Sequence, residues 1–80
     1  MLNVLLVEDE TLFAKSVLKR LQREGHTATV METITDANVY LEKSLPDVIL
    51  LDVRLPDASG LDFLQSLRAH QSWHAIPVIM

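Results

Sequence analysis

The sequence contains no cysteine and no long apolar run. The absence of cysteine excludes a disulfide framework and a thiolate metal site, and it is consistent with the reducing cytoplasm, where we expect this protein to work. A membrane-spanning helix needs about 20 consecutive apolar residues, and no stretch of the chain approaches that length. The opening MLNVLLVEDE lacks the basic start of a signal peptide and becomes acidic at once. We therefore expect no contact with a membrane.

Basic residues are also scarce. Seven Lys and Arg stand against eleven Asp and Glu, which gives a net charge of −4. The basic residues are scattered, whereas nucleic-acid binders concentrate positive charge, so we expect no direct binding of nucleic acid by this segment. Apolar residues make up 49% of the chain and charged residues 22%, which is typical of a globular protein. A length of 80 residues corresponds to one small domain.

Apolar patterns predict short strands that alternate with helices. The predicted strands are residues 3–7, 26–31, 47–51 and 75–80, and the predicted helices are residues 11–24, 33–45 and 61–70. This alternation predicts an α/β fold with a parallel sheet, right-handed crossovers and helices on its faces. The third strand is apolar without alternation, so we expect both of its faces to be covered.

The ends and inner faces of the helices can also be predicted. Gly25 should end the first helix as a left-handed residue, and either Thr33 or Thr35 should cap the second. For the third helix two inner faces are compatible with the spacing, one built on leucines and one that includes Phe63. The two alternatives are Leu61, Leu64 and Leu67, or Phe63 and Leu67.

Three acidic residues follow two of the predicted strands. Glu8 and Asp9 come after the first strand, and Asp52 ends the third. In open α/β sheets the functional residues lie at the carboxyl ends of the strands. If the two strands are neighbours, the three carboxylates converge, and an all-oxygen set of this kind suits a hard cation such as Mg²⁺. An Asp beside such an ion can act as a nucleophile towards phosphorus.

A second explanation of the same acids is purely structural. Glu8 and Asp9 would favour the positive end of the first helix, and Asp52 would start a turn. The spacing favours the magnesium site but does not identify its chemistry.

The segments VLLVEDE, DVILLDVRLPDASG and IPVIM, in this order, resemble the receiver domain of two-component response regulators. The resemblance covers all 80 residues, and the ordered combination is far more specific than either half. It implies a flavodoxin-like three-layer α/β/α fold with the first four strands in the order 2-1-3-4. It also implies a phosphoacceptor that works as a signalling switch and not as a metabolic enzyme, although a complete receiver assists its own phosphorylation and dephosphorylation.

The resemblance assigns roles to individual residues. Asp52 would be the phosphoacceptor, and Mg²⁺ would be held by Glu8, Asp9, Asp52 and the backbone carbonyl of Arg54. Pro56 and Gly60 match the loop after the acceptor. The donor would be a sensor histidine kinase or a phosphotransfer protein. A further acid in the loop, Asp57, and Asp62 at the start of the third helix are assigned to local structure and not to the metal.

The sequence also departs from the family. It lacks the Ser or Thr after the fourth strand, the Lys after the fifth strand and the last helices, so we expect residues 1–80 to be a single incomplete receiver domain. Without the last helix, apolar positions of residues 3–7 and 47–51 should be uncovered, and residues 75–80 should form an exposed edge. An alternative function is therefore a fragment that does not switch and self-associates through that exposed edge and the uncovered face. A phosphatase of the haloacid dehalogenase type is disfavoured, because Arg54 stands where that family needs a second Asp.

Overall fold

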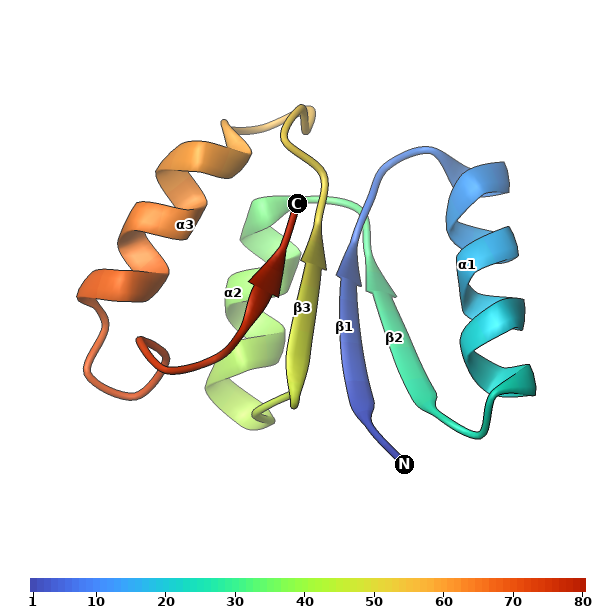
Figure 1. Ribbon diagram of the computed structural model, residues 1–80. Coiled ribbons are helices and arrows are strands. Elements are labelled where there is room, and N and C mark those ends of the chain that lie inside the picture. Colours follow the sequence, from blue (N-terminus) through green and yellow to red (C-terminus); the bar gives the residue numbers. More distant parts are fainter.

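A computed structural model describes all 80 residues as seven elements in the order β1-α1-β2-α2-β3-α3-β4 (Figure 1). The strands are β1 (Asn3–Val7), β2 (Thr27–Met31), β3 (Val48–Leu51) and β4 (Val78–Ile79). The helices are α1 (Thr11–Arg23), α2 (Ile34–Lys43) and α3 (Gly60–Ala69). The predicted alternation is confirmed. None of the three helices has the length and apolar character needed to cross a membrane.

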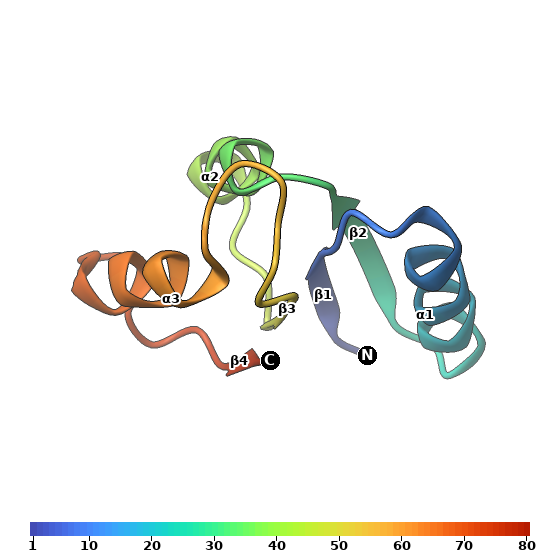
Figure 2. The same ribbon diagram turned by 90° about the horizontal axis from the view of Figure 1, so that it is seen from above.

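The four strands form one parallel sheet in the order β2-β1-β3-β4, as the family resemblance implied. Helices α2 and α3 lie on one face of this sheet, and α1 lies on the other (Figure 2). Strand β4 is shorter than predicted, because the chain before it follows a turn in which Ile76 donates to the Trp73 carbonyl. Pro77 has no N–H to donate to the sheet, although its carbonyl accepts from Ile49.

The main core lies between the sheet and the pair α2 and α3. Strand β3 alternates there, because Ile49 and Leu51 are 0% and 4% exposed whereas Val48 and Leu50 are only half-buried. The prediction that both faces of β3 are covered is therefore wrong. Helix α1 packs on β2, on the face of the sheet opposite the main core. It leaves the same face of β3 open. The core residues are Leu5, Val7, Ile34, Ala37, Leu41, Ile49, Leu51, Phe63, Leu67 and Ile76.

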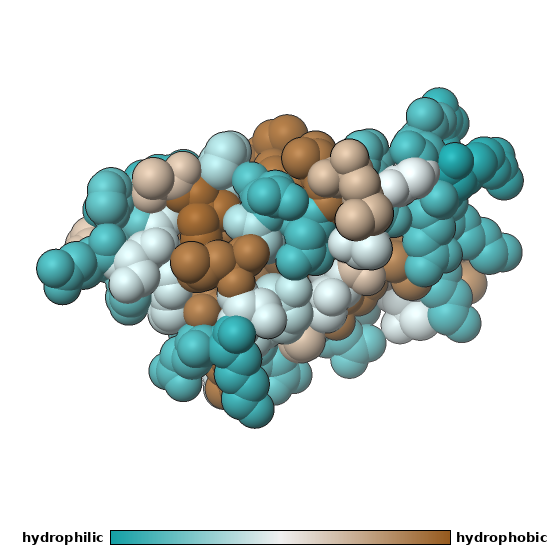
Figure 3. Space-filling model, turned by 90° about the horizontal axis from the view of Figure 1, so that it is seen from below, coloured by the Kyte–Doolittle hydropathy of each residue, from teal (hydrophilic) through white to brown (hydrophobic).

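Strand β1 behaves differently from β3. Val4 and Leu6, which point away from the main core, are only 1% and 4% exposed. The expectation that apolar positions of residues 3–7 are uncovered is thus wrong for β1, which is central in the sheet, and it holds only in part for β3. Other apolar side chains are exposed at the opposite end of the sheet from the predicted acidic site, among them Met1 and Leu45. Figure 3 shows this end as separate apolar areas among hydrophilic ones.

The helix ends follow local rules. Gly25 has φ +88° and follows Glu24, the C-cap of α1, as a left-handed helix stop requires. The Thr33 hydroxyl accepts from the Asp36 N–H at 3.0 Å, so Thr33 is the cap of α2 and Thr35 is not. In α3, Phe63 is 2% exposed and Leu61 is 55% exposed, which selects the second of the two predicted inner faces.

Candidate functional site

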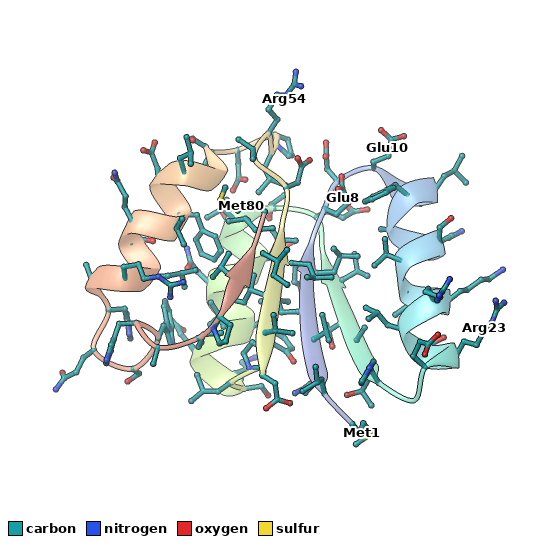
Figure 4. All side chains as sticks on the ribbon, in the orientation of Figure 1. Met1, Glu8, Glu10, Arg23, Arg54 and Met80 are labelled. Carbon is teal, nitrogen blue, oxygen red and sulfur yellow. The ribbon has the colours of Figure 1, made fainter.

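The carboxyl ends of β1 and β3 lie side by side. Val7 pairs with Leu51 in the parallel register, and the Asp52 N–H donates to the Val7 carbonyl at 3.0 Å. The residues that follow the two strands therefore leave the sheet at the same level. Figure 4 shows the Glu8 side chain at this edge, near the ends of the strands.

The structure brings the three predicted acids together. One carboxylate oxygen from each of Glu8, Asp9 and Asp52 can be chosen so that all three atoms lie within 4.8 Å of one another. Glu8 is 8% exposed, Asp52 is half-buried and Asp9 is exposed. These three residues are called the acidic cluster below.

Burial and repulsion both act on Glu8. Burial is the main cause that raises the pKa of the Glu8 carboxyl above its ordinary value. The hydrogen bond from the Glu10 N–H lowers it, and the neighbouring charges of Asp52 and Asp9 raise it again. A bound cation would remove this repulsion, so the electrostatics of the acidic cluster favour a positive ligand.

Local hydrogen bonds account for only part of the acidic cluster. Glu8 Oε2 accepts from the Glu10 N–H at 3.0 Å, and Asp52 Oδ1 accepts from the Arg54 N–H at 3.2 Å. The N-cap of α1 is Glu10, which makes no side-chain cap bond, and the Asp9 side chain accepts no hydrogen bond. The hydrogen bonds of caps and turns thus use one oxygen each of Glu8 and Asp52 and none of Asp9, for which the positive end of α1 is the only structural explanation.

The donor set fits a hard divalent cation. All three side chains offer carboxylate oxygens, and Mg²⁺ is bound in proteins by one or two carboxylates together with water and other oxygen ligands. Arg54 follows directly after Val53, and its side chain points away from the acidic cluster into solvent (Figure 4). A guanidinium has no acceptor atom, so only the backbone carbonyl of Arg54 is a candidate ligand.

The loop that carries Arg54 runs from Val53 to Ser59 and is called the acceptor loop below. Its two ends are tied together, because the Gly60 N–H donates to the Val53 carbonyl at 2.9 Å and Arg54 forms an antiparallel bridge with Ser59. A Cβ at Gly60 would lie 2.6 Å from the Asp52 carbonyl oxygen and 2.9 Å from the Val53 Cα. Only glycine fits this close approach, so Gly60 closes the loop beside Asp52.

Asp57 makes a contact that the sequence did not predict. Its Oδ1 accepts from the Ile34 N–H at 3.0 Å, and its Oδ2 accepts from the Thr35 N–H at 3.0 Å and from the Thr35 hydroxyl at 2.8 Å. The hydrogen bond from Ile34 is the main cause that lowers the pKa of Asp57 below its ordinary value, followed by those from Thr35. Asp57 does lie outside the acidic cluster, as predicted, and Asp62 lies in the first turn of α3. No local sequence pattern predicts this contact, because Asp57 and Ile34 are 23 residues apart.

Comparisons with known proteins identify the family of this chain. Residues 4–80 match the response regulator receiver domain. The sensory transduction protein RegX3 of Mycolicibacterium smegmatis is 42% identical over 80 residues, and the KDP operon transcriptional regulatory protein KdpE of Escherichia coli is 36% identical. In both cases the alignment covers 100% of this chain and 34% of the relative, so the chain spans about a third of their length.

Solved structures show the same fold. The phosphorylated cyanobacterial phytochrome response regulator RcpA superposes with a TM-score of 0.89 at 27% identity, over 96% of this chain and 61% of RcpA. The sequence match begins within β1 and continues to Met80, and it includes both strand ends that carry the acidic cluster. The chain belongs to the response regulator receiver family.

Proposed function

We propose that this chain is the phosphoacceptor part of a receiver domain, with Asp52 as the phosphorylated residue. In this proposal Mg²⁺ is held by Glu8, Asp9, Asp52 and the Arg54 carbonyl. The observation that carries the proposal is the meeting of three carboxylates within 4.8 Å at the carboxyl ends of β1 and β3. Receiver domains are signalling modules, and the resemblance to named response regulators supports this role.

Asp52 is arranged for attack on phosphorus. Its Oδ1 is engaged by the Arg54 N–H, which fixes the carboxylate and leaves Oδ2 as the nucleophile. The new bond joins Oδ2 to phosphorus while the bond from phosphorus to the donor nitrogen of a histidine breaks, and the electron pair of that bond stays on the nitrogen. When bound, Mg²⁺ neutralises the negative charge of the phosphoryl oxygens and of the carboxylates.

A sensor histidine kinase or a phosphotransfer protein is proposed as the phosphoryl donor, because the chain matches the response regulator receiver domain. Residues 1–80 would supply β1 to β4 and α1 to α3 of one receiver domain, with the acceptor and the acidic ligands included. Phosphorylation of a receiver biases a two-state equilibrium that other surfaces detect, so the role of this part is to accept the signal.

The direct test is the intact mass of the protein after incubation with Mg²⁺ and acetyl phosphate. We expect a gain of one phosphoryl group that needs Mg²⁺ and is absent from Asp52→Asn. Asp62→Asn is the matched control, because it removes the same charge from an exposed position in α3 and should keep the gain. Labelling of Asp52→Asn, or no labelling of a folded wild-type chain that binds Mg²⁺, would contradict the proposal.

A second candidate function, self-association of the 80-residue chain, is favoured by the open side of the sheet. Strand β4 is the last strand of the sheet, and Ile79 and Met80 are 60% and 48% exposed. An open apolar groove of about 390 Å³ runs from α1 across β3 to this edge, with Phe13 and Val53 on its walls. A strand with one unpaired edge is a template for a second strand, so two copies could pair β4 with β4 in antiparallel orientation.

Self-association can be separated from phosphorylation by light scattering after size exclusion. We expect a dimer that a charged residue at the edge, Ile79→Lys, converts to a monomer. Val39→Lys adds the same positive charge at an exposed apolar position of α2, away from β4, and controls for the introduced charge. A wild-type chain that is monomeric over the whole accessible concentration range would overturn this candidate.

A further inference from the structure

The acceptor loop has anchors of two kinds. At its base, the Arg54 N–H donates to the Asp52 carboxylate, and the Gly60 N–H donates to the Val53 carbonyl. These contacts join only the loop and the residues that flank it. At its tip, Leu55 packs against the main core, and the Asp57 carboxylate reaches a different element, the first turn of α2. Asp57 thus supplies the polar anchor that connects the loop to the rest of the fold.

The contact uses donors that the helix itself cannot satisfy. The first N–H groups of an α-helix have no intrahelical acceptor, and the N-terminus carries partial positive charge. Thr33 serves one of these groups, the Asp36 N–H, and Asp57 serves those of Ile34 and Thr35. The Thr35 hydroxyl adds a third bond. Bonds to an ionised carboxylate are roughly twice as strong as neutral ones, so the tip of the loop is firmly held.

Asp57 lies close in sequence to Arg54, whose backbone carbonyl is one of the proposed Mg²⁺ ligands. Only Leu55 and Pro56 separate it from Arg54, and the pyrrolidine ring of Pro56 fixes one of the backbone torsions between them. We therefore expect a displacement of Asp57 to shift the Arg54 carbonyl, although Leu55 limits the shift. We infer that Asp57 is a positioning residue of the metal centre, which binds the first turn of α2 and so holds the acceptor loop with the Arg54 carbonyl in place for the ion. This inference rests on the proposed function.

The expected effect is a loss of Mg²⁺ affinity with all three carboxylates of the acidic cluster intact. Loss of a residue that orients a metal ligand typically lowers affinity about 10–100-fold, and we expect the lower end because Leu55 still holds part of the loop. The variant Asp57→Asn keeps the shape of the side chain. It loses the charge and turns one acceptor into a donor, which would face the backbone N–H of either Ile34 or Thr35.

Two readouts test the inference. The first is Mg²⁺ affinity by calorimetric titration, where Asp57→Asn should bind about 10-fold more weakly than wild type. The second is hydrogen exchange in the absence of metal, where the Gly60 amide should lose protection because the loop is released. Two controls should leave both readouts unchanged. Thr33→Ala removes the other cap of α2, and Asp62→Asn removes an equal charge from α3.

The outcomes distinguish the inference from the proposed function. A wild-type chain that binds no Mg²⁺ overturns both. A wild-type chain that binds Mg²⁺ and an Asp57→Asn variant of equal affinity overturn the inference alone. If Asp57→Asn does not fold, Thr35→Val removes only the hydroxyl bond, and it should weaken Mg²⁺ binding by a smaller factor. Unchanged affinity in a folded Thr35→Val variant then counts against the inference.

Discussion

Replacement of Gly60 by Ala tests whether the closed base of the acceptor loop is needed for stability and for the ion. The added Cβ would lie 2.6 Å from the Asp52 carbonyl oxygen, 2.9 Å from the Val53 Cα and 3.1 Å from the Val53 carbonyl oxygen. All three atoms belong to the backbone, so no side-chain rotation relieves the contact. The backbone of Asp52 is further restrained by its bond to the Val7 carbonyl.

The change in the free energy of unfolding caused by Gly60→Ala is the difference between a steric cost and a gain in helix propensity. Overpacking costs about 1–3 kcal/mol, and the rigid backbone around Gly60 places this case at the upper end. Alanine gains at most about 1 kcal/mol over glycine by helix propensity, since Gly60 is the first residue of α3. The steric effect therefore wins, and we expect a net loss of about 2 kcal/mol. For a domain of this size that lowers Tm by about 8–16 °C.

Gly25 provides the matched glycine. An alanine there meets nothing within 4 Å, but the φ of +88° costs it about 1–2 kcal/mol in the left-handed region. Gly25→Ala should thus lose a similar amount of stability by a different mechanism and far from the acidic cluster. Urea unfolding measures both losses, and Mg²⁺ titration of the folded variants measures the ion site.

Only Gly60→Ala should weaken Mg²⁺ binding, because only this substitution displaces the backbone that leads to the Arg54 carbonyl. A Gly60→Ala variant as stable as wild type would refute the steric reasoning. A destabilised variant with unchanged Mg²⁺ affinity would show that the shape of the loop base does not affect the ion site.

Three other predictions follow from the structure. The raised pKa of Glu8 means that the carboxyl keeps its proton to higher pH in the folded state than in the unfolded state. Its contribution to the free energy of unfolding therefore falls as pH rises from about 4.5 through the folded-state pKa. Urea unfolding at several pH values should give a flatter dependence of this free energy on pH for Glu8→Gln. The lowered pKa of Asp57 has the opposite effect: its contribution to the free energy of unfolding is complete above about pH 3.8 and is lost as pH falls through the folded-state pKa. An Asp57→Asn variant whose stability falls with acid as steeply as that of wild type would contradict this. Asp52→Asn without Mg²⁺ should raise the free energy of unfolding by about 1 kcal/mol, the repulsion of two unit charges at ~4 Å in water, and saturating Mg²⁺ should reverse the order of the two proteins.

Much of the local structure could be predicted because its causes lie within a few residues. The apolar spacing of α1, the left-handed Gly25 and the cap at Thr33 depend on neighbours in the chain. The two inner faces proposed for α3 could not be separated, because both satisfy helical spacing and only the position of α3 on the sheet buries Phe63 and exposes Leu61.

The residues of the candidate site were predictable for a similar reason, since acids that follow a strand in the sequence leave the sheet at the end of that strand. Their meeting was not predictable from spacing alone. It depends on β1 and β3 being neighbours, a contact between residues more than forty positions apart that strand order decides. The family resemblance supplied this order in advance.

The amino-acid order of this chain is therefore sufficient for the alternation of its strands and helices and for the identity of its acidic residues. Packing in three dimensions determines three other features: the half-open face of β3, the short length of β4 and the contact of Asp57 with α2. The physical reason is range. Propensity, capping and periodicity act along the backbone over one or two turns, whereas burial and the partners of a loop carboxylate depend on which distant segment the folded chain places beside it.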